Sequence, residues 1–138
     1  MNKKAEIGTF SVASLLTNSG ATLGVPAITK IKTTFNDGIA AFLNLPKESN
    51  LYFYYFFTSK TTELRAINMG AAQPNLNIDI IKSITIPVPT LAEQQEIVRI
   101  LDTVLEKESR AKEAARTVLD QIALLKKSIL ARAFRGEL

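Results

Sequence analysis

The chain has 138 residues, of which 46% are hydrophobic and 22% charged, so we expect one globular domain carrying at most one extension. It contains no histidine and no cysteine, which excludes disulfides, thiolate or imidazole metal sites, and Cys or His catalysis. The formal net charge is +4, with +3 in residues 1–90 and +1 in residues 91–138. This charge permits binding to phosphates, although a solvated surface explains it more simply.

The N-terminal residues show no targeting signal. Lys3 and Lys4 are followed by Glu6 rather than by an apolar segment, and no apolar run reaches the roughly 18 residues that span a bilayer. We therefore expect an unprocessed cytoplasmic protein with no membrane contact, no bound metal and no cofactor.

Short strands separated by turns are predicted in the first part of the chain. Apolar or alternating stretches cover residues 12–16, 25–31 and 38–43, with turn residues at 18–20, at Gly24 and at 36–38. The Asp37-Gly38 pair is typical of a hairpin connection.

The aromatic run 51–57 is ambiguous. Its composition favours a strand, whereas Pro46 and the capping residues Ser49 and Asn50 favour a helix start. Residues 61–69 then predict a short helix that ends at Gly70. Residues 85–88 predict a last short strand, which the flanking prolines confine to a sheet edge or end.

A long helix is predicted after these prolines. Thr90 and Glu93 form a capping-box pattern, and no glycine or proline follows until Gly136. Such a helix would be on the order of 60 Å long, so it needs another helix to cover its apolar face. Steps of four and three define that face, called the seam below, by nine apolar positions: Ile97, Leu101, Val104, Ala111, Ala115, Val118, Ile122, Leu125 and Ile129.

Two features of the seam stand out. Glu108 interrupts it and predicts a kink or break near Ser109, while Ala111 and Ala115 would allow close approach of a partner helix. A helix that folds back on its own domain without any partner is the alternative.

The sequence offers no catalytic constellation. The carboxylates of residues 1–90 are scattered, and neither a GxGxxG nor a GxxxxGK[ST] pattern occurs. We therefore expect a non-catalytic protein.

Binding to DNA is better supported. Basic residues could contact phosphates and loop amides could pair with base edges, although asparagine and glutamine also crowd ordinary turns. The candidate residues are Lys30, Lys32, Asn36, Lys60, Arg65, Asn68, Gln73 and Asn75.

Several segments resemble one known family. Residues 70–77 and 84–95, together with Ile97-Val98 and Leu101-Asp102, are similar to the specificity subunit of type I restriction-modification systems. The C-terminal Ser128, Leu130, Ala133-Phe134 and Gly136-Glu137-Leu138 resemble the end of that family's helical spacer. Residues 15–24 are similar to the glycine loop of its target recognition domain, and residues 52–57 to the aromatic helix that follows, which tips that run toward helix.

The resemblance implies an α+β fold: a small mixed-sheet target recognition head with short helices, then a long helix forming a coiled coil. Residues 1–89 would be a partial target recognition domain and residues 90–138 the conserved helical spacer. In this family the recognition domain reads half of a split DNA target, the helix acts as a ruler, and other subunits methylate and cleave. The chain departs from the family pattern by having one domain and one helix, and by lacking strands expected before the glycine loop.

The implied partners are DNA, a methyltransferase subunit and a restriction subunit, with a second copy of the chain paired antiparallel along the seam. The alternative is a coiled-coil interaction protein that has lost DNA binding. Charged residues off the seam are the candidate docking residues for the methyltransferase: Arg99, Arg110, Arg116, Lys126 and Lys127.

Overall fold

The computed structural model describes residues 13–31, 34, 38–42, 45–67 and 75–138. The chain divides into two compact units, Met1–Val98, here called the head, and Arg99–Leu138. Among the described helices, none combines the length and the hydropathy that are needed to span a bilayer.

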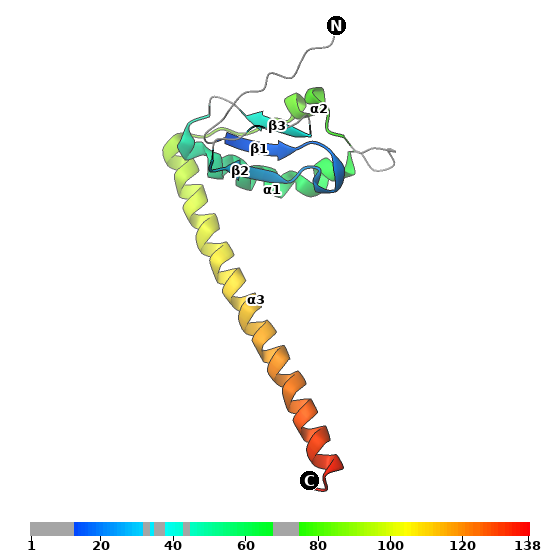
Figure 1. Cartoon of the computed structure of the whole chain (residues 1–138). Helices are drawn as coiled ribbons and strands as arrows, with labels where there is room; N and C mark the ends of the chain where they lie inside the picture. The colour runs from blue at the N-terminus through cyan, green and yellow to red at the C-terminus, as the bar shows by residue number, and fades with distance from the viewer. Residues whose placement is uncertain (1–12, 32–33, 35–37, 43–44, 68–74) are drawn as a thin grey trace. The chain divides into compact units, whose positions relative to one another are not determined.

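The head contains a three-stranded antiparallel sheet. Strand β1 (Ala13–Thr17) lies in the centre, between β2 (Pro26–Thr29) and β3 (Ile39–Phe42) (Figure 1). The three strands predicted for the first part of the chain, at residues 12–16, 25–31 and 38–43, therefore form. The hairpin predicted at Asp37-Gly38 is wrong, because β2 and β3 are not neighbours and each pairs with β1. The sheet was expected to be mixed, but all its described pairings are antiparallel.

The aromatic run forms a helix rather than a strand. Helix α1 (Asn50–Ala66) follows a 3-10 turn (Lys47–Ser49) and packs against β1 and β2 on one face of the sheet (Figure 1). It continues without a break to Ala66, so residues 61–66 are helical as predicted but belong to α1 rather than to a separate helix. The reason is the apolar spacing, since Phe53, Phe57 and Leu64 share one helical face and are all buried. The end predicted at Gly70 lies outside the described residues.

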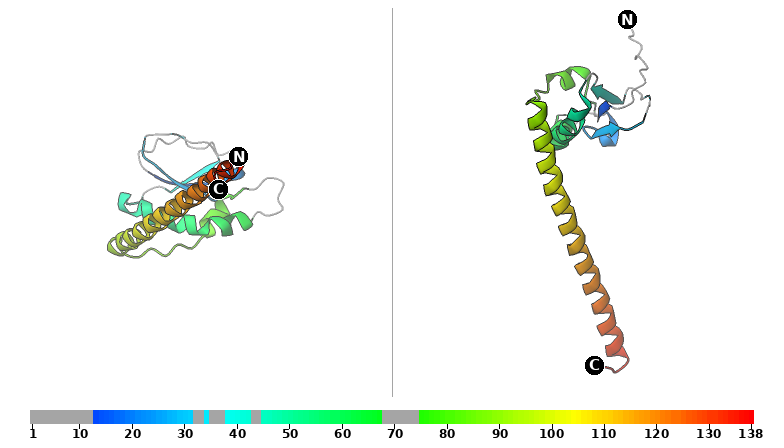
Figure 2. Two further views of the ribbon diagram at one scale, coloured as in Figure 1. Left: turned by 90° about the horizontal axis from the view of Figure 1, so that it is seen from below. Right: turned by 90° about the vertical axis from the view of Figure 1, so that its left-hand side faces the viewer.

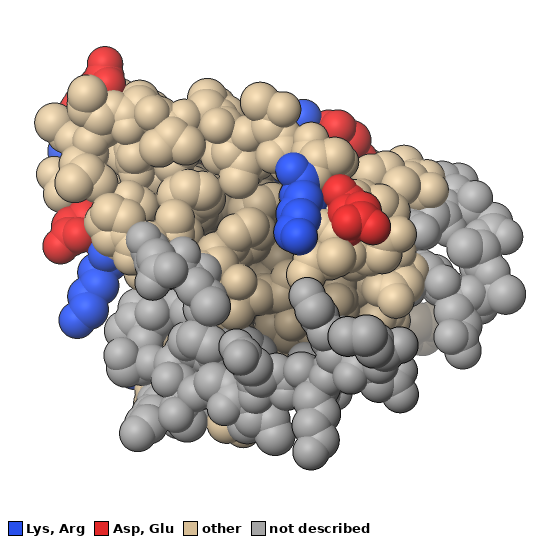
Figure 3. Space-filling view, turned by 90° about the horizontal axis from the view of Figure 1, so that it is seen from above, with Lys and Arg blue, Asp and Glu red and all other residues tan. Residues whose placement is uncertain are grey.

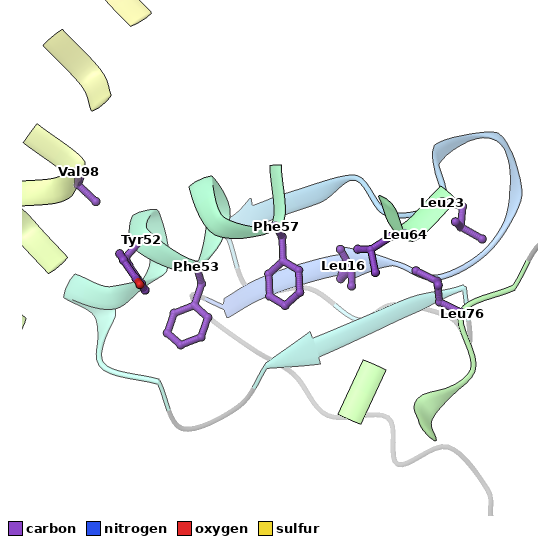
Figure 4. Close-up of a cluster of buried hydrophobic side chains, with 8 residues drawn as sticks. All are labelled: Leu16, Leu23, Tyr52, Phe53, Phe57, Leu64, Leu76 and Val98. Atoms are coloured by element: carbon purple, nitrogen blue, oxygen red, sulfur yellow. The ribbon is translucent and has the colours of Figure 1, made fainter. Parts of the chain in front are cut away.

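The core of the head is a single cluster that lies mostly between α1 and the sheet, with Val98 contributed by α3 (Figure 4). Its buried members are Leu16, Leu23, Tyr52, Phe53, Phe57, Leu64, Leu76 and Val98. A buried polar contact also ties β1 to the start of α1, because the Ser14 hydroxyl donates to Asn50 Oδ1 at 2.7 Å. Buried polar groups are tolerated when they are paired in this way.

The segment before the long helix differs from the prediction. Residues 85–88 form no strand and instead run as extended chain that packs Ile86 against the core. A short helix that the sequence analysis missed, α2 (Ile78–Ser83), precedes it. Asn77 caps α2 by accepting from the Ile80 amide at 2.9 Å.

Helix α3 (Leu91–Phe134) begins at the predicted capping box. Glu93 Oε2 accepts from the Thr90 amide at 2.9 Å and from the Thr90 hydroxyl at 2.8 Å, and the Glu93 amide donates back to that hydroxyl. The side-chain bond and then the backbone bond stabilise the charged carboxylate and lower the pKa of Glu93.

The end of α3 is equally well defined. Gly136 has φ +73°, the Glu137 amide donates to the Arg132 carbonyl and the Gly136 amide to the Ala133 carbonyl, which is the Schellman pattern. Arg135 forms two bonds with the Glu137 carboxylate and thereby lowers the pKa of Glu137. Between these ends α3 is one uninterrupted helix, visible in both views of Figure 2, so the break predicted near Ser109 is not present.

Candidate nucleic-acid interface and helix surface

The glycine loop between β1 and β2 is fastened to α1. The Thr61 hydroxyl donates to the Gly24 carbonyl at 2.9 Å, and Arg65 Nε donates to the Leu23 carbonyl at 3.0 Å. Gly24 has φ +77°, and a Cβ at this position would lie 3.2 Å from Leu64 Cβ. The close approach of loop and helix therefore requires glycine here.

The same loop is closed by Thr17, the last residue of β1. Its backbone carbonyl accepts from the Gly24 amide at 2.8 Å, and its hydroxyl accepts from the Val25 amide at 3.1 Å. The hydroxyl also contacts the Thr22 carbonyl. The loop is therefore tied to β1 at its base and to α1 along its side.

One predicted amide residue lies beside this loop. Asn75 forms an isolated antiparallel bridge with Ser19, and the neighbouring Leu76 amide donates to the Asn18 carbonyl at 2.7 Å. Asn75 is exposed while Leu76 is fully buried, so Leu76 anchors the segment and leaves Asn75 at the surface. The other predicted amides, Asn36, Asn68 and Gln73, lie outside the described residues.

The predicted phosphate contacts have unequal surroundings. Lys60 is ion-paired with Glu63 at 2.6 Å on the same helix, and Arg65 uses its Nε to hold the glycine loop. Lys30 is exposed directly after β2. Lys32 lies outside the described residues. Lys60 and Arg65 therefore have structural roles that the sequence analysis did not anticipate.

The described surface of the head carries no continuous basic patch on the face shown in Figure 3. Lysine and arginine appear there singly, with acidic side chains near several of them. Among the described residues no group of three or more acidic side chains could hold a metal ion.

A cleft of about 310 Å³ lies between the second half of α1 and the α2 region. Four of its eight lining residues are isoleucine or leucine, and the other four, which include the Lys60–Glu63 ion pair, are polar or charged. The lining residues are Lys60, Glu63, Leu64, Ile67, Ile80, Ser83, Ile84 and Thr85.

The seam of α3 is exposed along most of its length. All nine seam residues except Leu101, which is half-buried, are exposed. Val118 and Ile122 keep 52% and 56% of their surface, whereas a core residue would keep almost none. The interrupting Glu108 is paired with Lys112 at 2.6 Å on its own helix, so its charge is partly neutralised.

Further apolar residues widen this face. Ile100 and Leu119 flank the seam and are also exposed. The strict four-three count passed over them, but a 3.6-residue period would include them. Leu124 is exposed on the opposite side of the helix and does not belong to the stripe.

The candidate docking residues on α3 are all exposed. Arg110 is paired with Glu106 at 2.5 Å, and Arg99 also has an interaction within the chain. Arg116, Lys126 and Lys127 lie on the second half of the helix. Exposed ion pairs of this kind contribute little stability and are easily exchanged for intermolecular pairs.

Comparison with known proteins identifies the family. Residues 4–117 match the model of the type I restriction modification DNA specificity domain. The MjaIX specificity subunit of Methanocaldococcus jannaschii is 31% identical over 127 residues, which is 88% of this chain and 28% of that protein. The EcoDI specificity subunit of Escherichia coli is 27% identical over 118 residues, covering 82% of this chain and 27% of that protein.

The family match takes in nearly all of the head and more than half of α3. The chain belongs to the type I restriction modification DNA specificity domain family. It spans less than a third of the length of the relatives described above.

Proposed function

We propose that this chain is a DNA sequence-recognition module of a type I restriction-modification specificity subunit, and that it reads one half of a split DNA target. The observation that carries this proposal is the match over residues 4–117, which takes in the head and more than half of α3. In this proposal residues 1–89 act as the recognition domain and residues 90–138 as the spacer helix, and the module works in the cytoplasm.

The head would contact DNA through the glycine loop and its surroundings. Lys30 and Lys32 would bind phosphates and set the register, with Lys60 and Arg65 contributing where their present partners allow. The exposed Asn75 beside the loop would read a base edge. Asn36, Asn68 and Gln73 would complete the set of amide contacts.

The chain itself would carry out no catalysis. A methyltransferase subunit and a restriction subunit would supply methylation and cleavage, with the methyltransferase docking on Arg99, Arg110, Arg116, Lys126 and Lys127. The absence of cysteine and histidine from the sequence supports this division, because the commonest nucleophiles and general bases are missing.

The seam would pair two copies of the chain antiparallel. Its exposed apolar residues need cover, and an isologous pair would place Ala111 of one copy opposite Ala115 of the other at the centre. Small residues at the crossing would let the two helices approach closely. Each head would then read one half of the target.

The first expected result is weak, salt-dependent DNA binding by the isolated chain. With about three to five phosphate contacts, log affinity should fall against log salt with a slope of about −3 to −5. Fluorescence anisotropy over a salt series measures this, and Lys30→Ala should flatten the slope by about one. An affinity that does not change with salt concentration would contradict the phosphate contacts. The absence of binding even at low salt would favour the alternative of an interaction protein without DNA affinity.

The second expected result is that methyl transfer to DNA requires both this chain and the methyltransferase subunit. This chain alone and the methyltransferase subunit alone should give no sequence-directed transfer of radiolabelled methyl groups to DNA, and the two together should give it. If these residues dock the partner, the double variant Lys126→Glu, Lys127→Glu should lower methyl transfer by the two proteins together, because both charges are inverted. Methyl transfer by the purified chain alone would overturn the non-catalytic assignment.

A further inference from the structure

The segment that leads into α3 is held by two buried side chains, one from α1 and one from α3 itself. Tyr52 of α1 donates through its hydroxyl to the Pro87 carbonyl at 2.7 Å, and Gln94 of α3 donates through Nε2 to the Pro89 carbonyl at 2.8 Å. Proline has no N–H, so the carbonyl is its only backbone hydrogen-bonding group. Both prolines therefore use that group to join the segment to a helix.

Tyr52 and Gln94, here called the clamp, are both buried. Gln94 is 2% exposed and Tyr52 is 8% exposed. Val98, one turn after Gln94, belongs to the same buried cluster as Tyr52 (Figure 4). The first two turns of α3 are thus part of the head, and the fixed φ of the prolines adds stiffness to the connection.

Gln94 breaks the usual rule for buried polar groups. Its Oε1 is buried and has no hydrogen-bond partner among the described residues. A methionine would fill a similar volume and remove the unsatisfied acceptor, but it would also lose the Nε2 bond to the Pro89 carbonyl. These two effects on stability oppose each other, so stability alone does not explain the glutamine. Residues that violate a local rule at some cost are commonly functional ones.

We propose that Tyr52 and Gln94 are positioning residues that lock the first two turns of α3 onto α1 through the segment that carries Pro87 and Pro89. The consequence of this lock rests on the proposed function. If the first turns of α3 are held firmly, the DNA spacer length that the paired modules accept is fixed. Neither residue would contact DNA.

The lock can be tested by spin-label distance measurements on the whole chain. Because the sequence has no cysteine, Lys47→Cys and Glu113→Cys introduce two unique labelling sites, both exposed. Labelled chains are diluted into excess unlabelled chain to remove distances between copies. The variants are Tyr52→Phe, which removes one hydroxyl, and Gln94→Met; the matched controls are Tyr54→Phe on the same helix and Gln95→Met in the same turn.

The two clamp variants should make the distance distribution about twofold wider, because losing a constraint restores conformational freedom. The Gln94→Met variant should do so without lowering the thermal midpoint, a combination that a merely structural role would not produce. Both controls should leave the width unchanged. An unchanged width in Tyr52→Phe and Gln94→Met, or equal widening in the controls, would overturn the proposal.

A second measurement separates the lock from the proposed function. In the complex with the methyltransferase subunit, methylation is compared on targets whose central spacer is lengthened or shortened by one base pair. The clamp variants should accept the altered spacers relatively better than the unmutated chain does. A wider distance distribution without a relaxed preference for spacer length would support the lock but refute its role in DNA recognition.

Discussion

Ile122→Asp is expected to convert the proposed dimer into single chains. In the isolated chain Ile122 keeps 56% of its surface, so the substitution should be harmless to folding. In a paired seam the same aspartate would lie unpaired in a dry contact, which costs several kcal/mol. Light scattering across the micromolar range should give a two-chain mass for the unmutated protein and a one-chain mass for the variant.

Leu124→Asp is the matched control for this experiment. Leu124 is exposed to 66% and lies on the opposite side of α3, so the same change in charge should leave the dimer intact. If Leu124→Asp dissociates the protein as well, the seam is not the contact face. A one-chain mass for the unmutated protein at every concentration would rule out the homodimer itself.

The parts of the fold that the sequence predicts well are those with local causes. The start of α3 depends on Thr90 and Glu93, three residues apart, and its end depends on the conformational freedom of Gly136. Both were predicted to the residue or nearly so. The three strands were also found, because alternation and turn residues mark them.

The predictions from sequence were wrong where tertiary contacts determine the local structure. Residues 85–88 have the composition of a strand, but Tyr52 takes the Pro87 carbonyl and the segment pairs with no strand in the described head. The order of the sheet places β2 and β3 on opposite sides of β1, which no turn signal at Asp37-Gly38 could reveal. Pairing over such distances is not encoded in a short window.

The candidate site shows the same division. Composition identified Lys60 and Arg65 as cations, but it could not show that Glu63 and the Leu23 carbonyl already engage them. Conversely, the bridge that brings Asn75 to Ser19 joins residues 56 positions apart, and only the fold displays it. Gln94 gave no sign of its burial, because glutamine at a helix start usually faces solvent.

Gly24→Ala is expected to destabilise the head markedly, and Gly20→Ala much less. Both glycines have positive φ, +77° and +75°, so each alanine costs about 1 kcal/mol for the left-handed backbone. Only at Gly24 would the added Cβ also press on the neighbouring helix, 3.2 Å from Leu64 Cβ and 3.4 Å from the Thr61 carbonyl oxygen. We therefore expect about 2–3 kcal/mol in total for Gly24→Ala.

Urea denaturation of the two variants measures the difference directly, because the backbone term is common to both and cancels. A clear excess for Gly24→Ala would show that contact between loop and helix stabilises the head. It should also weaken DNA binding, since the glycine loop is proposed to meet the DNA and Thr61 and Arg65 would no longer hold it in place. Equal losses of stability would show that α1 can yield to the new methyl group, and the loop would then owe its position to Thr17 rather than to the helix.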